Sequence, residues 1–142
     1  MRLVPALMLI IVSGCSVFRG AADHSLYEQL LLSNLRETPY TAHIKIARVE
    51  KNREILSDSG ELGYVVFKVQ AEVIETYKGD KYSTIEYFVF REAPSEGPPV
   101  GENLIVSLRR SEEGDYYVSD NGYELPATES LIRLARSKTK QS

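Results

Sequence analysis

Gly63 to Tyr77 carries the pattern that most constrains the fold of this chain. Apolar and polar side chains alternate along the segment with a period of two, which is typical of a β-strand with one buried face. The apolar positions are Val65, Phe67, Val69, Ala71 and Val73. Most strands have about five or six residues, and a much longer strand normally bends or coils. The segment therefore favours a small closed barrel over a flat sheet.

Shorter alternating segments predict four more strands, and a helical pattern lies at each end of the series. We expect strands at Tyr40 to Glu50, Tyr82 to Arg91, Leu104 to Arg110 and Asp115 to Ser119. One helix is predicted at Ser25 to Glu37 and another from Pro126 or Ala127 to about Ser137, from apolar residues at spacings of three and four. Lys51 to Glu61 and Glu92 to Asn103 are predicted loops.

The predicted fold class is mainly β (α+β), a small five-stranded OB-like antiparallel barrel flanked by N- and C-terminal helices. We expect both helices to pack on this barrel. Its aromatic residues are candidates for a face that binds an oligosaccharide or a peptide, and they are Tyr64, Tyr82, Phe88 and Phe90. The alternative, which we expect, is that the two helices cover them.

The first fifteen residues form a second informative segment. Arg2 is followed by an apolar run from Leu3 to Val12, which suits a signal peptide because a membrane-spanning helix needs about 20 apolar residues. Val12-Ser13-Gly14-Cys15 then resembles the lipobox of bacterial lipoprotein precursors, an aliphatic residue and two small residues before a cysteine. The resemblance implies that signal peptidase II recognises Val12, Ser13 and Gly14 and cuts before Cys15. The Cys15 thiol would carry a diacylglyceryl group, and its new amino group would be acylated.

These patterns divide the chain into a signal peptide (1–14), a lipidated tether (15–24), an OB-like domain (25–138) and a basic polar tail (139–142). We expect the acylated Cys15 to hold the protein in a lipid bilayer of the cell envelope. An Asp after the lipidated Cys tends to signal inner-membrane retention, so Ser16 favours the outer membrane, facing the periplasm. The alternative is an ordinary secretory signal in which Cys15 occurs by chance.

Three stretches of the predicted barrel carry a second resemblance, to the netrin-like and TIMP-like domains. They are Thr41 to Ala47, Val65 to Gly79 and Gly101 to Leu108. The resemblance covers about residues 25–137 and implies an OB-fold on which two terminal helices pack together. TIMPs inhibit metalloproteases by chelating zinc through a free N-terminal Cys. Acylation would block that role at Cys15, and the single Cys of this chain forms no internal disulfide, unlike those of the animal members.

Composition and motifs argue against several classes of function. The formal net charge of −3 does not suggest a nucleic-acid-binding protein. The two histidines, His24 and His43, stand alone, and with Cys15 lipidated no zinc site of the usual ligands can form. No catalytic or phosphate-binding motif is present, and the pair Glu112-Glu113 reads as solvated turn residues. We therefore expect a protein that is not an enzyme and that uses no cofactor and no metal.

Two segments are candidate binding sites for a partner. The first is the predicted loop, with Arg91, Glu92, Pro98 and Pro99, for which the alternative is a structural Pro-rich loop. The second is the basic C-terminal end, with Arg133 and Arg136, whose cations also suit a helix C-terminus. We expect a non-catalytic binding module whose partner is an envelope protein or polymer. The alternatives are a TIMP-like protease inhibitor acting through barrel loops and an accessory subunit of an envelope complex.

Overall fold

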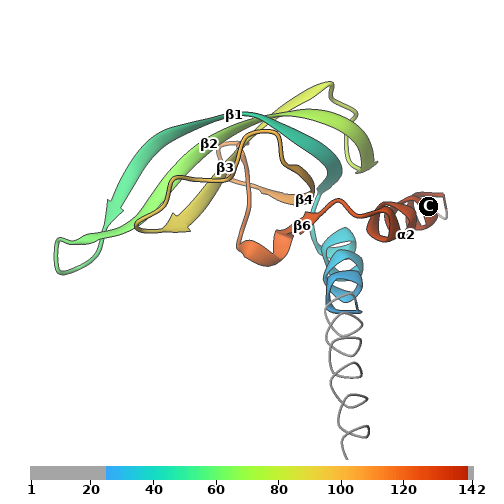
Figure 1. Cartoon of the computed structure of the whole chain (residues 1–142), viewed down its shortest axis with the longest axis horizontal. Coiled ribbons are helices and arrows are strands. Elements are labelled where there is room, and N and C mark those ends of the chain that lie inside the picture. The colour runs from blue at the N-terminus through green and yellow to red at the C-terminus, as the bar shows by residue number, and fades with distance from the viewer. Residues whose placement is uncertain (1–24, 141–142) are drawn as a thin grey trace, which may run out of the picture.

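A computed structural model describes residues 25–140, so the predicted signal peptide, lipobox and most of the tether lie outside the described residues. A helix covers residues 25–37, as expected. The elements that follow it are β1 (Tyr40–Leu56), β2 (Leu62–Lys78), β3 (Thr84–Glu92), β4 (Asn103–Arg110), β5 (Tyr116–Tyr117), the 3-10 helix η2 (Asn121–Tyr123), β6 (Glu124–Pro126) and α2 (Glu129–Thr139). Figure 1 shows a curved sheet with the two helices at one end.

The strands close into a ring in the order β1, β2, β3, β5, β4 and back to β1, with β6 added beside β4. Following the register from Glu50 through Lys68, Phe88, Tyr117 and Arg109 leads back to β1 next to Tyr40. The path therefore returns to β1 roughly ten residues before Glu50, where it began. Such a stagger between the first and last strands closes a small tilted barrel. The predicted fold class, a five-stranded OB-like barrel flanked by two helices, is confirmed.

One pair of neighbouring strands in the ring, β3 and β5, is parallel rather than antiparallel. The reason is geometric. Directions cannot alternate all the way round a ring of five strands, so at least one neighbouring pair must run the same way. This pair is held by the short contact between Phe88 and Tyr117 and by the Val118 amide, which donates to the Phe88 carbonyl at 3.0 Å.

The barrel interior is filled from the alternating positions expected in the sequence. Val65, Phe67, Val69 and Ala71 are buried there, and Val73 packs against them. The other strands contribute Tyr40, Ala42, Ile44, Ile46, Ile85, Tyr87, Val89, Leu104, Val106, Leu108 and Val118. Full burial of one large apolar side chain stabilises a fold by about 1.5–3 kcal/mol, so this cluster is the main apolar core of the domain.

The two helices pack on the outside of the ring, over β4 and β6. A second apolar cluster joins them to the barrel and contains Leu31, Tyr77, Ile105, Leu125, Leu131 and Ala135. The Asn34 side-chain amide also donates to the Gly122 carbonyl at 2.9 Å, which fixes the N-terminal helix against η2. α2 begins at Glu129 behind the N-cap Thr128, later than predicted, because Pro126 belongs to β6, a strand too short to show a pattern.

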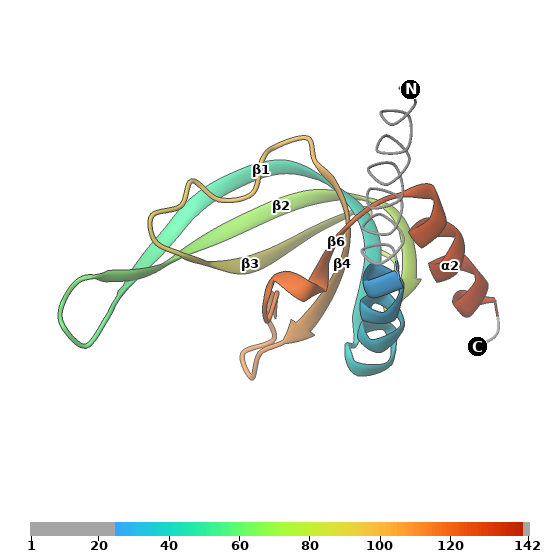
Figure 2. The same ribbon diagram turned by 60° about the horizontal axis from the view of Figure 1, so that its bottom comes forward.

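The prediction that Lys51 to Glu61 is a loop is wrong. β1 continues to Leu56 and β2 begins at Leu62, so only residues 57–61 form the turn. Within this turn, Gly60 takes a positive φ of +84°, which glycine adopts without steric cost. Residues 51–56 are largely exposed on both faces of the hairpin, which removes the alternation that identifies a strand. We call this projecting hairpin, residues 47–65, the arm (Figure 2).

The predicted loop after β3 packs on the barrel rather than standing free. The Ala93 amide donates to the Gly63 carbonyl at 3.0 Å, and the Gly101 amide donates to the Ile46 carbonyl at 2.7 Å. Gly97 has a φ of +85°, and a Cβ there would lie 2.9 Å from the ring of Phe67. The loop therefore covers part of the core and has a structural role.

Candidate functional site

The outer face of β2 and β3 carries apolar side chains that do not belong to the barrel interior. Tyr87 and Val89 point inward, so Phe88 and Phe90 point outward, because side chains alternate along a strand. Phe90 pairs with Val66 across the two strands, and directly paired residues lie on the same face. Val66 is only 1% exposed although it lies outside the barrel interior. Something on the outer face must therefore cover it.

A groove of about 440 Å³ lies at this position. Val66, Phe88 and Phe90 are among its lining residues, together with Asn52, Arg53, Ser111, Glu113, Asp115 and Tyr117. We call these nine residues the outer groove. One wall comes from the arm, since Arg53 pairs with Val66 in the sheet. The other wall is the turn between β4 and β5.

The β4–β5 turn is held in one conformation by its own hydrogen bonds. The Ser111 amide donates to the Asp115 carbonyl at 2.8 Å, and the Gly114 amide donates to the Ser111 carbonyl at 3.0 Å. Arg110 also donates from Nε to the Gly114 carbonyl at 3.1 Å. The wall of the outer groove is therefore formed by an ordered turn, and a ligand would meet a preformed surface.

Charged side chains of opposite sign stand on the two walls. Arg53 lies on the arm, and Glu113 and Asp115 lie on the turn. Within residues 25–140 none of these three side chains makes a hydrogen bond or ion pair. By contrast, Glu86 on the neighbouring part of β3 accepts from Gln70 at 2.6 Å and pairs with Lys68, contacts that lower its pKa. The charges at the groove are thus available to a partner.

The apolar floor of the outer groove continues onto the arm. On the arm, Leu56 is 62% exposed, Leu62 41% and Tyr64 48%, and Phe90 of the groove floor on β3 is 39% exposed. Tyr64 and Val66 are two residues apart on β2, so they share a face. We call Leu56, Leu62 and Tyr64 together with the outer groove the arm-and-groove surface. Contiguous exposed apolar area of this kind marks interaction sites on soluble domains.

The prediction that the helices cover the barrel aromatics is wrong. The helices lie over Ile105 and Leu125, on β4 and β6, and over the end of β2 at Tyr77. They leave open the part of β2 and β3 that carries Tyr64 and Phe90, which are 48% and 39% exposed. Tyr82 takes a different place, in a cluster with Tyr40 and Tyr116 at ring-centroid distances of 5.7 and 6.3 Å. A hydrogen bond between the Tyr82 and Tyr116 hydroxyl groups, 3.2 Å long, is the main cause that raises the pKa of Tyr82 to about 12.

The four residues of the predicted loop site, Arg91, Glu92, Pro98 and Pro99, differ in how deeply they are buried. Arg91 forms an ion pair with Glu124 of β6 at 2.6 Å, with side chains 22% and 9% exposed. Burial raises the pKa of Glu124, and the nearby Arg91 opposes that shift. Pro98 is buried, whereas Glu92 and Pro99 are exposed. Arg91 thus joins β3 to β6, and a role of these four residues in partner binding stays a prediction.

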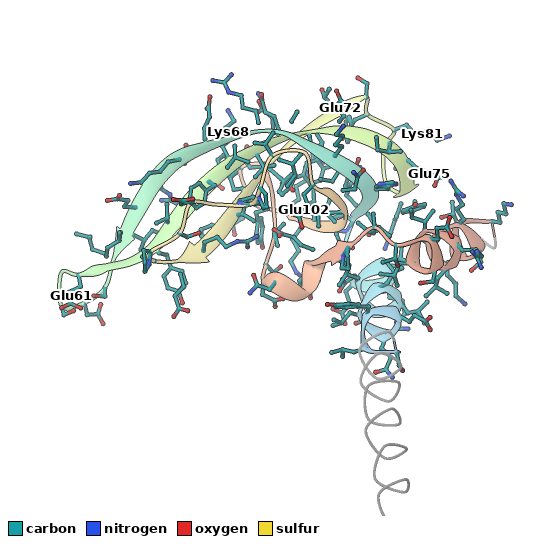
Figure 3. The ribbon with its side chains drawn as sticks, in the orientation of Figure 1. Glu61, Lys68, Glu72, Glu75, Lys81 and Glu102 are labelled. Carbon is teal, nitrogen blue, oxygen red and sulfur yellow. The ribbon has the colours of Figure 1, made fainter. Side chains whose placement is uncertain are left out.

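The predicted basic site at the C-terminal end is partly neutralised. Arg136 donates from Nε to both Glu75 carboxylate oxygens, at 2.8 and 3.0 Å, and so joins α2 to β2. Arg133 is exposed. Figure 3 shows Glu75 at the end of β2 beside α2, while Glu61 lies at the far tip of the arm. The role of Arg133 and Arg136 in partner binding stays a prediction.

Sequence reasoning missed Val66, Arg53 and the β4–β5 turn as parts of one site. The signal that points to them is the presence of Phe88 and Phe90 between the inward residues of β3, which requires a second apolar environment outside the barrel.

Among residues 25–140 no group of three or more His, Cys, Asp or Glu could hold a metal ion. His43 instead shares a hydrogen bond of 3.2 Å with Asn103. In the same part of the chain no helix is long and apolar enough to cross a membrane.

Comparison of the sequence with protein-family models found no match, and comparison with curated proteins also found none.

Proposed function

We propose that this protein is a lipid-anchored, non-catalytic binding module of the bacterial cell envelope, which binds a partner protein on the arm-and-groove surface. The observation that carries the proposal is that the apolar floor of the groove adjoins exposed apolar side chains on the arm. OB-folds commonly bind ligands on the face of their second and third strands, between the loop of the first hairpin and the loop before the fifth strand. The outer groove lies on this same face, between the arm and the β4–β5 turn.

The anchoring part of the proposal is supported by the start of the sequence. A short apolar run precedes Val12-Ser13-Gly14-Cys15, and nine residues separate Cys15 from the first described residue, Ser25. Two or three acyl chains on one residue suffice for stable attachment to a bilayer. The proposed location is the outer membrane, with the domain facing the periplasm.

A protein partner suits the surface better than a polysaccharide. Leu56, Leu62 and Phe90 offer exposed apolar area, whereas a sugar polymer would need its many hydroxyl groups satisfied. The rim adds charge of both signs, from Arg53 on one wall and from Glu113 on the other. Apolar anchors inside a charged rim are typical of protein–protein interfaces. We therefore propose a partner that presents an apolar anchor flanked by a basic group facing the turn.

Co-purification from detergent-solubilised envelopes tests this proposal. The full-length protein should recover a specific partner, and Leu62→Ser combined with Phe90→Ser should weaken that binding by about 30-fold, since central anchors contribute about 2 kcal/mol or more. Ile74→Ser is the matched control, because Ile74 is another exposed apolar residue of β2 but does not line the groove. Equal loss in the control, or full retention in the double variant, would contradict the proposal.

A further inference from the structure

A second groove, of about 400 Å³, lies at the other end of the molecule, between the ends of the two helices. Its floor is apolar and consists of Leu32 and Leu35 from the N-terminal helix and Tyr77 from β2. Its remaining lining residues are Arg36, Lys78, Lys138 and Thr139. We call it the helix-end groove. Three of the seven lining residues are cationic and none is acidic, so the groove is both apolar and positively charged.

Of the three cations of this groove, Lys78 donates a hydrogen bond to a helix C-terminus, and the other two do not. Lys78 donates from Nζ to the Leu35 carbonyl at 2.7 Å and so serves the end of the N-terminal helix. The Thr139 hydroxyl donates to the Ala135 carbonyl at 2.9 Å and serves the end of α2 in the same way. Arg36 and Lys138 are exposed, and neither side chain has a hydrogen bond or ion pair within residues 25–140. Their two charges remain free for a ligand.

A neighbouring groove shows why these two cations, rather than Arg136, are the relevant ones. It shares Tyr77 and Thr139 with the helix-end groove and is lined by Glu75 and Arg136. There Arg136 is already neutralised, because it contacts both Glu75 oxygens. Lys140 is the other cation of that groove, and no leucine side chain lines the groove beside it. The exposed, unpaired cations that adjoin the leucine side chains are therefore Arg36 and Lys138.

We propose that the helix-end groove binds an anionic lipid. Its acyl chain would lie on Leu32, Leu35 and Tyr77, and its headgroup would lie between Arg36 of the N-terminal helix and Lys138 of α2. The complementarity is twofold, because an anionic amphiphile matches both the apolar floor and the free cations. This inference does not depend on a partner for the arm, which lies at the opposite end of the molecule (Figure 1).

The groove also lies on the helix to which the proposed anchor leads, at the opposite end of that helix from Ser25. The N-terminal helix supplies three of its lining residues, and the same helix follows the segment that begins at Cys15. A lipid bound here would hold the helix end of the domain at the bilayer surface and leave the arm directed away from it.

Native mass spectrometry of the full-length protein in a nonionic detergent tests the inference. The probes are phosphatidylglycerol, phosphatidylcholine and inorganic phosphate. We expect one phosphatidylglycerol adduct that persists when phosphatidylcholine adducts have dissociated, and no retained phosphate. Arg36→Gln combined with Lys138→Gln should lower the phosphatidylglycerol affinity by about 30-fold, because each basic residue near an anionic lipid contributes about 1 kcal/mol. Leu35→Ser should lower it as well.

The matched control is Lys51→Gln combined with Arg53→Gln, which removes two cations from the arm at the other end of the molecule. It should leave lipid binding unchanged. Thermal unfolding of each variant checks that the domain is intact. Arg36, Arg53 and Lys138 are exposed, Lys51 pairs with Glu54 at the surface, and Leu35 is partly buried. Equal retention of both lipids, undiminished phosphatidylglycerol binding in the Arg36 and Lys138 variant, or tight binding of phosphate alone would overturn the proposal.

Discussion

The ion pair between Arg91 and Glu124 is a largely buried charge pair that joins β3 to β6. Removal of one partner leaves the other charge buried without compensation, which typically costs about 3–5 kcal/mol. We expect Arg91→Ala to lower the free energy of unfolding by about 3 kcal/mol, measured by urea denaturation. Glu92→Ala, at the exposed neighbouring residue, is the control and should change stability by less than about 0.5 kcal/mol. Similar values for the two variants would refute a structural role for Arg91.

The carboxyl group of Glu124 should give stability an unusual dependence on pH. Burial raises the pKa of Glu124 above its ordinary value of about 4.5, so the folded protein binds this proton more readily than the unfolded chain does. The stability due to this group is therefore complete below about pH 4.5 and is lost as the pH rises through the raised pKa. We expect Glu124→Gln to remove that loss. Urea denaturation of both proteins at a series of pH values measures it, and parallel curves above pH 4.5 would contradict the assignment.

At the scale of single elements, the loop between β3 and β4 is predicted to stabilise the core through Gly97. An added Cβ would meet the Phe67 ring at 2.9 Å, and φ is +85°. Gly101→Ala is a matched control, because Gly101 has a φ of +89° but nothing within 4 Å of the added atom. We expect Gly101→Ala to cost about 1 kcal/mol from the backbone alone, and Gly97→Ala to cost about 1–3 kcal/mol more from the clash. Thermal denaturation compares them, and equal costs would show that the loop does not press on Phe67.

Much of the element order could be predicted from sequence, because one-sided burial leaves a periodic pattern. Val65, Phe67 and Val69 are the clearest case, since they face the barrel interior from a strand whose other face is mainly polar. The outer part of β1 lacked that signal because solvent surrounds residues such as Arg53 and Glu54 on both faces. β6 was missed because three residues are too few to show a period.

The outer groove could be predicted only in part. Phe88 and Phe90 were identifiable as an apolar set on the second face of β3. Arg53 and the β4–β5 turn reach the same groove through the closure and stagger of the ring, which depend on contacts between residues far apart in the chain. No local pattern records such contacts. The helices were expected on this face, yet the apolar residues Ile105 and Leu125 place them over β4 and β6.

At the scale of the whole molecule, the arm and the helix pair lie at opposite ends of the barrel (Figures 1 and 2). A protein anchored through the N-terminal segment would thus present the arm-and-groove surface away from the bilayer. Cys15→Ala tests the anchor, because it removes the only thiol of the chain. We expect an unprocessed precursor of higher mass that lacks acyl chains, detected by intact-mass measurement and membrane fractionation. Wild-type mass and fractionation of the variant would contradict lipid attachment at Cys15.

The central claim is that the arm-and-groove surface binds a partner protein, and site-specific photo-crosslinking in living cells tests it most directly. A photoreactive residue at Tyr64 lies beside the groove, whereas one at Glu72 lies on the same strand outside it (Figure 3). We expect one discrete adduct from position 64 and none from position 72, with the adduct abolished by Phe90→Ser. No adduct from position 64, or the same adduct from both positions, would contradict the claim.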